Sequence, residues 1–139
     1  MSNGDGCPFC QIVEGEIESH MVHENETAMA FLDVNPVSKG HTLVVPKQHA
    51  EELSGLDRED AEEVFGTVKD VAEALENALN PEGTNILQSN GEAAGQEIPH
   101  MHVHVIPRYR TDGLFFSFDS SDLSEDEAEE VLESVRSRL

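Results

Sequence analysis

The sequence is poor in basic residues. Lysine and arginine together number 8, against 29 aspartates and glutamates, which gives a formal net charge of −21 at pH 7. Because nucleic-acid binding depends on basic side chains that contact phosphates, this balance argues against DNA or RNA as a partner.

The acidic residues are spread along the chain rather than gathered in one tail. An ordinary solvated surface and adaptation to high salt both account for this distribution. We favour the second, in a halophilic archaeon, because self-repulsion opposes the compact state and about 1 M salt shortens the screening length to about 3 Å. The free energy of unfolding should then rise with KCl concentration in denaturation curves, and full stability at low salt would contradict the interpretation.

Long apolar runs are also missing, since no stretch reaches the ~18 apolar residues of a membrane-spanning helix. Residues Met1–Gly6 have neither the basic segment nor the apolar core of a signal peptide. We therefore expect no membrane partner and a cytoplasmic location. A length of 139 residues suits one domain over 1–139, with core motifs in 7–110 and a C-terminal helix in about 125–139.

Two segments have apolar residues at helical spacing. The first runs from about Arg58 to Leu79 after a possible N-cap at Asp57, and the second begins near Glu125 after the capping-box residue Ser124. Each has one apolar stripe, which we expect to be buried. The stripe of the second helix consists of Ala128, Val131, Leu132, Val135 and Leu139.

Short apolar runs bounded by turn residues predict five strands, at 21–23, 27–32, 42–45, 85–88 and 102–106. Strands that follow one another without an intervening helix are usually antiparallel. The predicted fold class is therefore α+β: one antiparallel sheet of about five strands, one long helix and a C-terminal helix.

Three histidines alternate with apolar residues at the start of the last predicted strand. Alternate side chains of a strand share a face, so His100, His102 and His104 should line one face at intervals of about 6.6–6.8 Å. Three such residues in register favour metal binding, catalysis or both over a purely structural role. A neutral imidazole can attack phosphorus when an acceptor holds the proton on its other nitrogen.

The two cysteines, Cys7 and Cys10, form a Cys-x-x-Cys pair. A zinc ion needs four ligands, and His49 and one of the alternating histidines are the obvious remaining donors. A redox-active dithiol and two inert buried thiols are the alternatives.

Two further segments bear on a site. Residues 90–98 form a loop of small residues that leads into the histidine run and offers backbone amides to a phosphate. Residues 35–49 hold His41 and His49, and Asp33 stands just before them. Asp33 is either a turn residue or an acid that binds ribose hydroxyls.

The run from His100 to Ile106 reads His-Met-His-Val-His-Val-Ile, followed by Pro107 and Arg108. It closely resembles the signature of the histidine-triad (HIT) superfamily, in which three histidines alternate with apolar residues. The resemblance extends from Cys7 to about Arg110, and the segment from Gly40 to His49 supports it independently. Within the superfamily, the chain is most similar to the Hint-like branch and to prokaryotic members that carry zinc.

Such proteins are homodimers whose sheets join across the interface. They hydrolyse or transfer nucleoside monophosphates that are linked through phosphorus to a leaving group, as in phosphoramidates, acyl-nucleotides and dinucleoside polyphosphates. The resemblance therefore implies an enzyme with a nucleotidyl-histidine intermediate and a substrate derived from a purine nucleoside monophosphate.

The resemblance also implies roles by position. His102 is the implied nucleophile, and His104 and His41 are the implied catalytic residues that orient the phosphate. The implied nucleotide-binding residues are the apolar pocket walls, the ribose-binding acid and the phosphate-contacting positions: Phe9, Ile12, Phe31, Asp33, Asn90, Gln96 and Glu97. Glu97 departs from the common Ser or Thr, so the leaving group is its alternative contact. The implied ligands of a structural zinc ion are Cys7, Cys10, His49 and His100.

Two other functions remain open from the residues. A nucleotide-binding interaction protein would bind nucleotide tightly with negligible turnover. A pure metal-binding module would bind more than one zinc ion per chain, because the histidines of the run would also serve as ligands.

Overall fold

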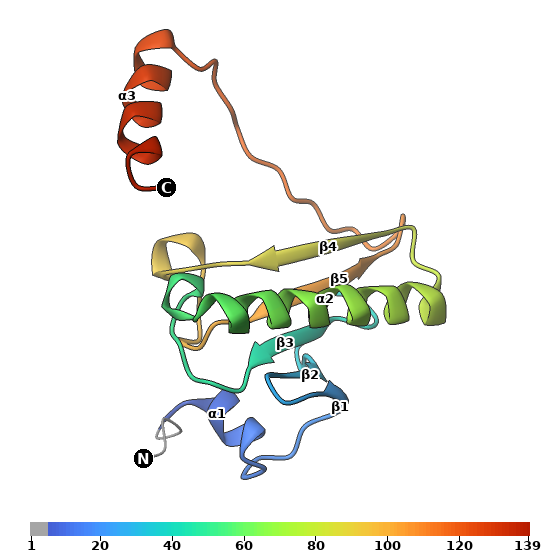
Figure 1. Cartoon of the computed structure of the whole chain (residues 1–139). Coiled ribbons are helices and arrows are strands. Elements are labelled where there is room, and N and C mark those ends of the chain that lie inside the picture. The colour runs from blue at the N-terminus through green and yellow to red at the C-terminus, as the bar shows by residue number, and fades with distance from the viewer. Residues whose placement is uncertain (1–5) are drawn as a thin grey trace.

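A computed structural model describes residues 6–139 of the chain. Five strands form one antiparallel sheet in the order β1-β2-β3-β5-β4 (Figure 1). Their bounds are β1 Met21–Glu24, β2 Ala28–Leu32, β3 Thr42–Pro46, β4 Gly83–Gln88 and β5 Val103–Arg108. The predicted α+β class and the antiparallel sheet are confirmed, with strand bounds within three residues of those expected. Met1–Asp5, on which the signal-peptide prediction rests, lie outside the described residues.

The long helix α2, Arg58–Leu79, has the predicted bounds and covers one face of the sheet (Figure 1). Its apolar stripe buries Val64, Val68 and Val71 against Val44, Met101 and other core residues. It ends at Asn80, whose left-handed conformation (φ 49°) turns the chain toward β4. Among the described residues, no helix has the length and apolar character needed to cross a membrane.

Three short helices were not predicted. Helix α1 spans Pro8–Val13, and the single-turn helices η1 and η2 span Leu53–Gly55 and Glu92–Ala94. Cys7 is the N-cap of α1, where its Sγ accepts a hydrogen bond from the Cys10 amide at 3.3 Å, and Pro8 occupies the first helical position. One face of α1 packs into a second core cluster with Met29, Phe31, Leu43 and Val45.

The histidine run lies only partly on a strand. Strand β5 begins at Val103, so His104 is on the strand while His100 and His102 precede it. The expected alternation persists all the same, because Met101, Val103 and Val105 are fully buried on the core side. The expectation that one strand carries all three histidines was therefore wrong, because β5 begins only at Val103.

The C-terminal segment leaves the sheet after β5. Helix α3, Glu125–Arg136, begins as predicted with Ser124 accepting a hydrogen bond from the Glu127 amide at 3.2 Å. Its apolar stripe is not buried in this chain, contrary to the prediction: Val131 is 50% exposed and Leu139 fully exposed. Figure 1 shows why, since an extended connection carries α3 away from the rest of the fold.

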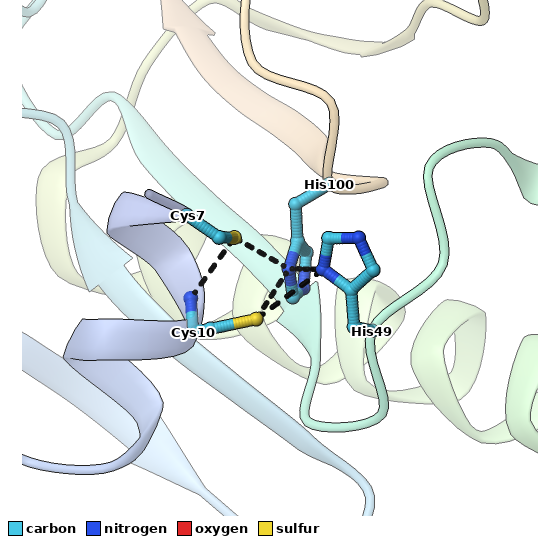
Figure 2. Close-up of side chains that lie close together, drawn as sticks. All are labelled: Cys7, Cys10, His49 and His100. Carbon is cyan, nitrogen blue, oxygen red and sulfur yellow. Dashed lines mark hydrogen bonds between the residues drawn. The ribbon is translucent and has the colours of Figure 1, made fainter. Parts of the chain in front are cut away.

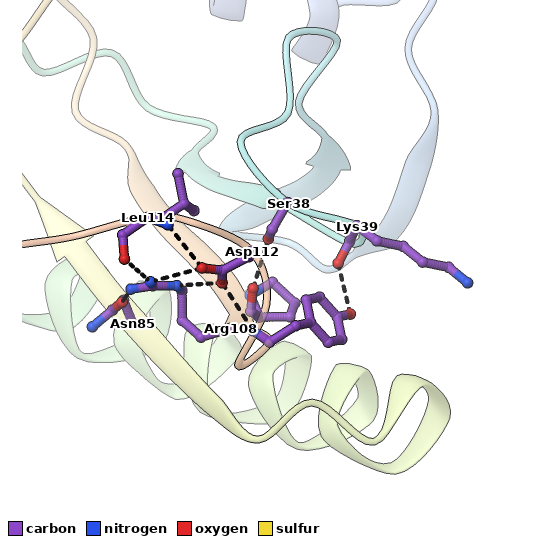
Figure 3. A network of polar contacts seen from close by, with 8 residues as sticks. Ser38, Lys39, Asn85, Arg108, Asp112 and Leu114 are labelled. Carbon is purple, nitrogen blue, oxygen red and sulfur yellow. Dashed lines mark hydrogen bonds and ion pairs between the residues drawn. The ribbon is translucent and has the colours of Figure 1, made fainter.

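The start of this connection is fixed by Arg108 (Figure 3). Its guanidinium donates to both carboxylate oxygens of Asp112 (2.8 and 3.1 Å), to Asn85 Oδ1 (2.7 Å) and to the Leu114 carbonyl (2.6 Å). The hydrogen bonds from Arg108 hold the pKa of Asp112 well below its usual range. Arg108 therefore orders the bend after β5 and is not available to a ligand as a free cation.

Candidate active site and metal centre

A pocket of about 440 Å³ opens between α1, the β2–β3 connection and the histidine run. It is lined by eight of the predicted nucleotide-binding and catalytic side chains and by further, mainly apolar residues. Predicted residues in its lining are Phe9, Ile12, Phe31, Asp33, His41, Glu97, His102 and His104, and Leu43, Val34 and Val37 also line it. Its volume falls in the range of small-molecule sites, about 300–1,000 Å³.

His102 is held with one ring nitrogen free. Its Nδ1 lies 2.7 Å from the His100 carbonyl oxygen, which can only accept, so Nδ1 carries the proton. In the neutral ring, Nε2 then has the lone pair. The ring is 8% exposed and lies edge-on to Phe9, with ring centroids 5.0 Å apart. An imidazole that lines a pocket with one unprotonated nitrogen has the geometry to act as a nucleophile.

The tautomers of His41 and His104 are also fixed, by a chain of hydrogen bonds that begins at a backbone amide. The Val37 amide donates to His41 Nδ1 at 3.1 Å, so neutral His41 carries its proton on Nε2. That Nε2 lies 2.9 Å from His104 Nδ1, which must accept, so His104 carries its own proton on Nε2. A donor is thereby available for a phosphate oxygen beside His102, whose ring centroid is 5.0 Å from that of His104.

Burial keeps the His41 and His104 rings neutral. It lowers the pKa of His104 to about 4, with His102 and His41 adding to the effect and Asp33 opposing it. Burial also lowers the pKa of His41, against the opposing effect of Asp33. Near neutral pH both rings therefore remain in the single-proton form. The hydrogen bonds from the Val37 amide to His41 and from His41 to His104, here called the relay, require this form.

An NMR titration should find the His104 ring neutral at pH 6 and titrating near pH 4. Because this pKa lies below that of the unfolded chain, the unfolded state binds more protons between about pH 6.5 and pH 4. The contribution of His104 to stability is therefore full above about pH 6.5 and declines as the pH falls toward 4. Midpoint titration near pH 6.5 would show that the ring is solvated and would contradict the relay.

Asp33 accepts a hydrogen bond within the turn after β2 and also lines the pocket. Its Oδ1 accepts the Asn35 amide at 2.8 Å, while Oδ2 lies 3.5 Å from His41 Nε2. Asp33, His41 and His104 have the composition of a metal site. The tautomers oppose that use, since His41 Nδ1 already accepts the Val37 amide and Nε2 is the protonated nitrogen.

The predicted phosphate-contacting residues Asn90 and Gln96 do not line the pocket. Asn90 Oδ1 accepts the Leu53 amide at 2.7 Å, and Gln96 accepts the Gly91 amide and donates to the Glu51 carbonyl. Both side chains thus brace the loop that carries η2, whereas Glu97 lies on the pocket side. Their contact with a phosphate stays a prediction.

A second cluster lies behind this pocket. Cys7, Cys10, His49 and His100 come together from α1, the loop after β3 and the segment before β5 (Figure 2). Both Cys7 Sγ and Cys10 Sγ lie within 3.4 Å of His100 Nδ1, and Cys10 Sγ is 3.3 Å from His49 Nδ1. His49 Nδ1 and His100 Nδ1 are 3.1 Å apart. Burial, with a contribution from Cys7, raises the pKa of the Cys10 thiol to about 12.

The donor set fits a tetrahedral zinc ion. Zn–N bonds of about 2.0–2.1 Å and Zn–S bonds of about 2.3 Å imply donor separations of about 3.3–3.8 Å, close to those seen. His100 Nε2 lies 2.9 Å from the Pro46 carbonyl oxygen, so the His100 proton is on Nε2 and the Nδ1 lone pair points into the cluster. No sequence signal indicated this carbonyl or the Val37 amide, because backbone atoms are common to all residues.

The model of the HIT domain family matches residues 14–111. The chain is 39% identical over 142 aligned positions to the protein hit of Bacillus subtilis, covering all of this chain and 98% of that protein. It is 37% identical to an adenosine 5′-monophosphoramidase of Schizosaccharomyces pombe, covering 96% of this chain and 98% of that one.

Solved structures of proteins in the same family are also similar to this chain. A HIT family protein of Bacillus subtilis superposes with a TM-score of 0.90 at 40% identity, covering 96% of both chains. A zinc-bound histidine triad family protein of Mycobacterium smegmatis superposes with a TM-score of 0.77 at 31% identity, covering 99% of this chain and all of that one.

Proposed function

The chain belongs to the HIT domain family, and on that premise we propose that it cleaves nucleoside monophosphate derivatives through a nucleotidyl-histidine intermediate. The observation that carries the proposal is the fixed tautomer of His102, whose Nδ1–H donates to the His100 carbonyl oxygen at 2.7 Å. In the neutral ring, this tautomer leaves the Nε2 lone pair free where His102 lines the pocket. Similarity to an adenosine 5′-monophosphoramidase supports the same chemistry.

In the proposed reaction, His102 Nε2 attacks the α-phosphorus of the bound nucleotide. A P–N bond forms to His102 as the bond from phosphorus to the leaving group breaks, and a leaving amine takes up a proton from solvent. Water then attacks phosphorus and gives up a proton to solvent, the bond to His102 breaks, and the nucleoside monophosphate departs. The His104 Nε2–H donates to a phosphate oxygen in both steps, because the His41 Nε2–H occupies its other nitrogen.

The substrate side of the proposal follows from the lining. Phe9, Ile12 and Phe31 offer apolar and aromatic surface for a purine base, and Asp33 offers a carboxylate to the ribose hydroxyls. Phosphoramidates, acyl-nucleotides and dinucleoside polyphosphates share this nucleotide half and differ only in the leaving group. Asn90, Gln96 and Glu97 remain proposed contacts for the phosphate or for that group.

We also propose that Cys7, Cys10, His49 and His100 hold a structural zinc ion. All four positions of a tetrahedral site are then filled by protein, so the ion stabilises the fold and contacts no substrate. A zinc-bound histidine triad protein among the similar structures supports the choice of metal.

A homodimer in the cytoplasm is the proposed assembly, with each chain acting as one HIT domain. Strand β4 is an edge strand of the sheet, and the apolar stripe of α3 is uncovered by its own chain. Both surfaces are available to a second copy. Light scattering on the full chain in molar KCl should give twice the monomer mass, and a monomer at all concentrations would contradict this assembly.

The proposed activity is tested by a substrate panel in molar KCl. The purified protein is mixed with an adenosine phosphoramidate, an acyl-adenylate and a dinucleoside polyphosphate, and acid-free quenching is followed by mass spectrometry of the peptide containing His102. Turnover of at least one substrate with nucleotide trapped on His102 supports the proposal. Tight nucleotide binding without turnover or trapping on the whole panel would overturn it in favour of a binding protein.

A further inference from the structure

The metal cluster and the nucleotide pocket share helix α1. Cys7 and Cys10, at the N-cap and in the first turn, face the cluster, while Phe9 and Ile12 line the pocket. The helix has only six residues, and helices shorter than about 12–15 residues are marginal in water on their own. Its position therefore depends on the side chains that fasten it to the sheet.

Phe9 is the residue that links α1 to the nucleophile. Its ring is 5.0 Å from that of His102, 5.6 Å from Phe31 and 5.8 Å from His100, in edge-to-face contacts. Phe9 is 5% exposed and packs with Met29 and Leu43 in the core cluster. Because these apolar contacts also hold α1, release of the cluster should loosen the helix without detaching it completely.

His100 joins the two sites a second time. Its Nδ1 lies among the Cys7, Cys10 and His49 donors, and its carbonyl oxygen accepts the proton of His102 Nδ1 at 2.7 Å. The ring is fully buried, with Nε2 held by the Pro46 carbonyl. A ligand bond at Nδ1 therefore fixes the residue whose backbone sets the His102 tautomer.

We propose that the metal cluster is the positioning device of the nucleotide pocket. Cys7 and Cys10 hold α1 so that Phe9 forms the base wall, and His100 holds its own carbonyl against His102. The three are positioning residues, since none touches the reacting atoms. The inference rests on the proposed nucleotide site, but it concerns how that site is assembled.

The inference makes an ordered prediction for metal removal. Chelation of the full-length protein in molar KCl should raise amide exchange in residues 7–15 first, with little change in α2. Under those conditions the Kd for AMP should rise by about tenfold, the equivalent of about 1.4 kcal/mol. The ¹⁵N shifts of the His102 ring should move toward a mixture of tautomers, and adding zinc back should reverse all three changes.

Two variants separate positioning from general stability. His49→Gln removes one donor that neither lines the pocket nor belongs to α1, so it should reproduce the chelation result in milder form. Val64→Ala is the matched control, because Val64 is fully buried on α2 in the other core cluster. It should lower the urea concentration at the midpoint of unfolding and leave the Kd for AMP within about twofold, about 0.4 kcal/mol.

The outcomes separate this inference from the proposed function. If the zinc-loaded protein fails to bind AMP, the proposed function fails. The amide exchange rates of residues 7–15 and the ¹⁵N shifts of the His102 ring then still decide whether the cluster orders α1. Unchanged exchange in residues 7–15 and unchanged His102 shifts after chelation would overturn the inference. It would also be overturned if α1 and α2 exchanged together, because the metal would then stabilise the whole fold without selecting the pocket.

Discussion

Replacing His102 with glycine is expected to lower the turnover of an adenosine phosphoramidate by at least about 10³-fold. Among residues 6–139, no other side chain in the pocket offers a free imidazole lone pair where His102 Nε2 stands, because the His104 proton is on Nε2 and its Nδ1 accepts from His41. Binding of AMP should persist, since Phe9, Phe31 and Asp33 still line the pocket. Steady-state kinetics and calorimetry measure the two effects separately.

Two comparisons make the His102 result specific. His23→Gly removes an exposed histidine of β1 and should leave turnover unchanged. Added imidazole should partly restore turnover to the His102→Gly variant, because the small ring fits the space that the side chain leaves. Turnover of the variant at the level of the unmodified protein would exclude His102 as the nucleophile.

Gly40→Ala is expected to lower the free energy of unfolding by about 2–4 kcal/mol. Gly40 has φ +93°, where an L side chain is strained, and an added Cβ would lie 2.5 Å from Leu79 Cδ1 and 3.2 Å from Pro107 Cγ. The Leu79 methyl can move aside, whereas Pro107 is a rigid ring in the buried part of β5. Strain at Gly40 should also displace His41 next to it, and with it the proton on His104.

Gly66→Ala provides the control for this prediction. Gly66 lies inside α2 and an added Cβ would meet nothing within 4 Å. Alanine is favoured over glycine in a helix by about 0.5–1 kcal/mol, so this variant should gain stability. Urea denaturation in molar KCl compares the two, and a loss at Gly40 below about 1 kcal/mol would show that the loop relaxes around the new methyl.

Regular patterns were predictable from the sequence. The stripe of α2 and the alternation of Met101, Val103 and Val105 identified the elements that cover and cross the core. The same logic failed for α3, because periodicity shows that a face is apolar but not which surface covers it. Helix α1 was missed because six residues carry too little periodic signal, and its stability comes from contacts distant in the chain.

Much of the candidate site follows from residue type, and its geometry does not. Cys7 and His100 are 93 residues apart, so only the fold brings their donor atoms together. The sequence likewise indicated that the histidines near β5 belong to functional sites, but it did not indicate which nitrogen of each ring carries the proton. Adaptation to high salt stays a prediction, because a structure reports where acidic side chains lie and not the solution that they require.

The relay of protons that reaches His104 begins at the amide of Val37. Every amino acid except proline supplies the same group, so the polarity of the relay is insulated from most point mutations at this position. Proline there would remove the donor that sets the His41 tautomer, and a different path of the β2–β3 connection would move that donor away. What is inherited at residue 37 is thus the course of the main chain and not the chemistry of a side chain. A chain with similar histidines on a rerouted loop would keep the residues and lose their proton order.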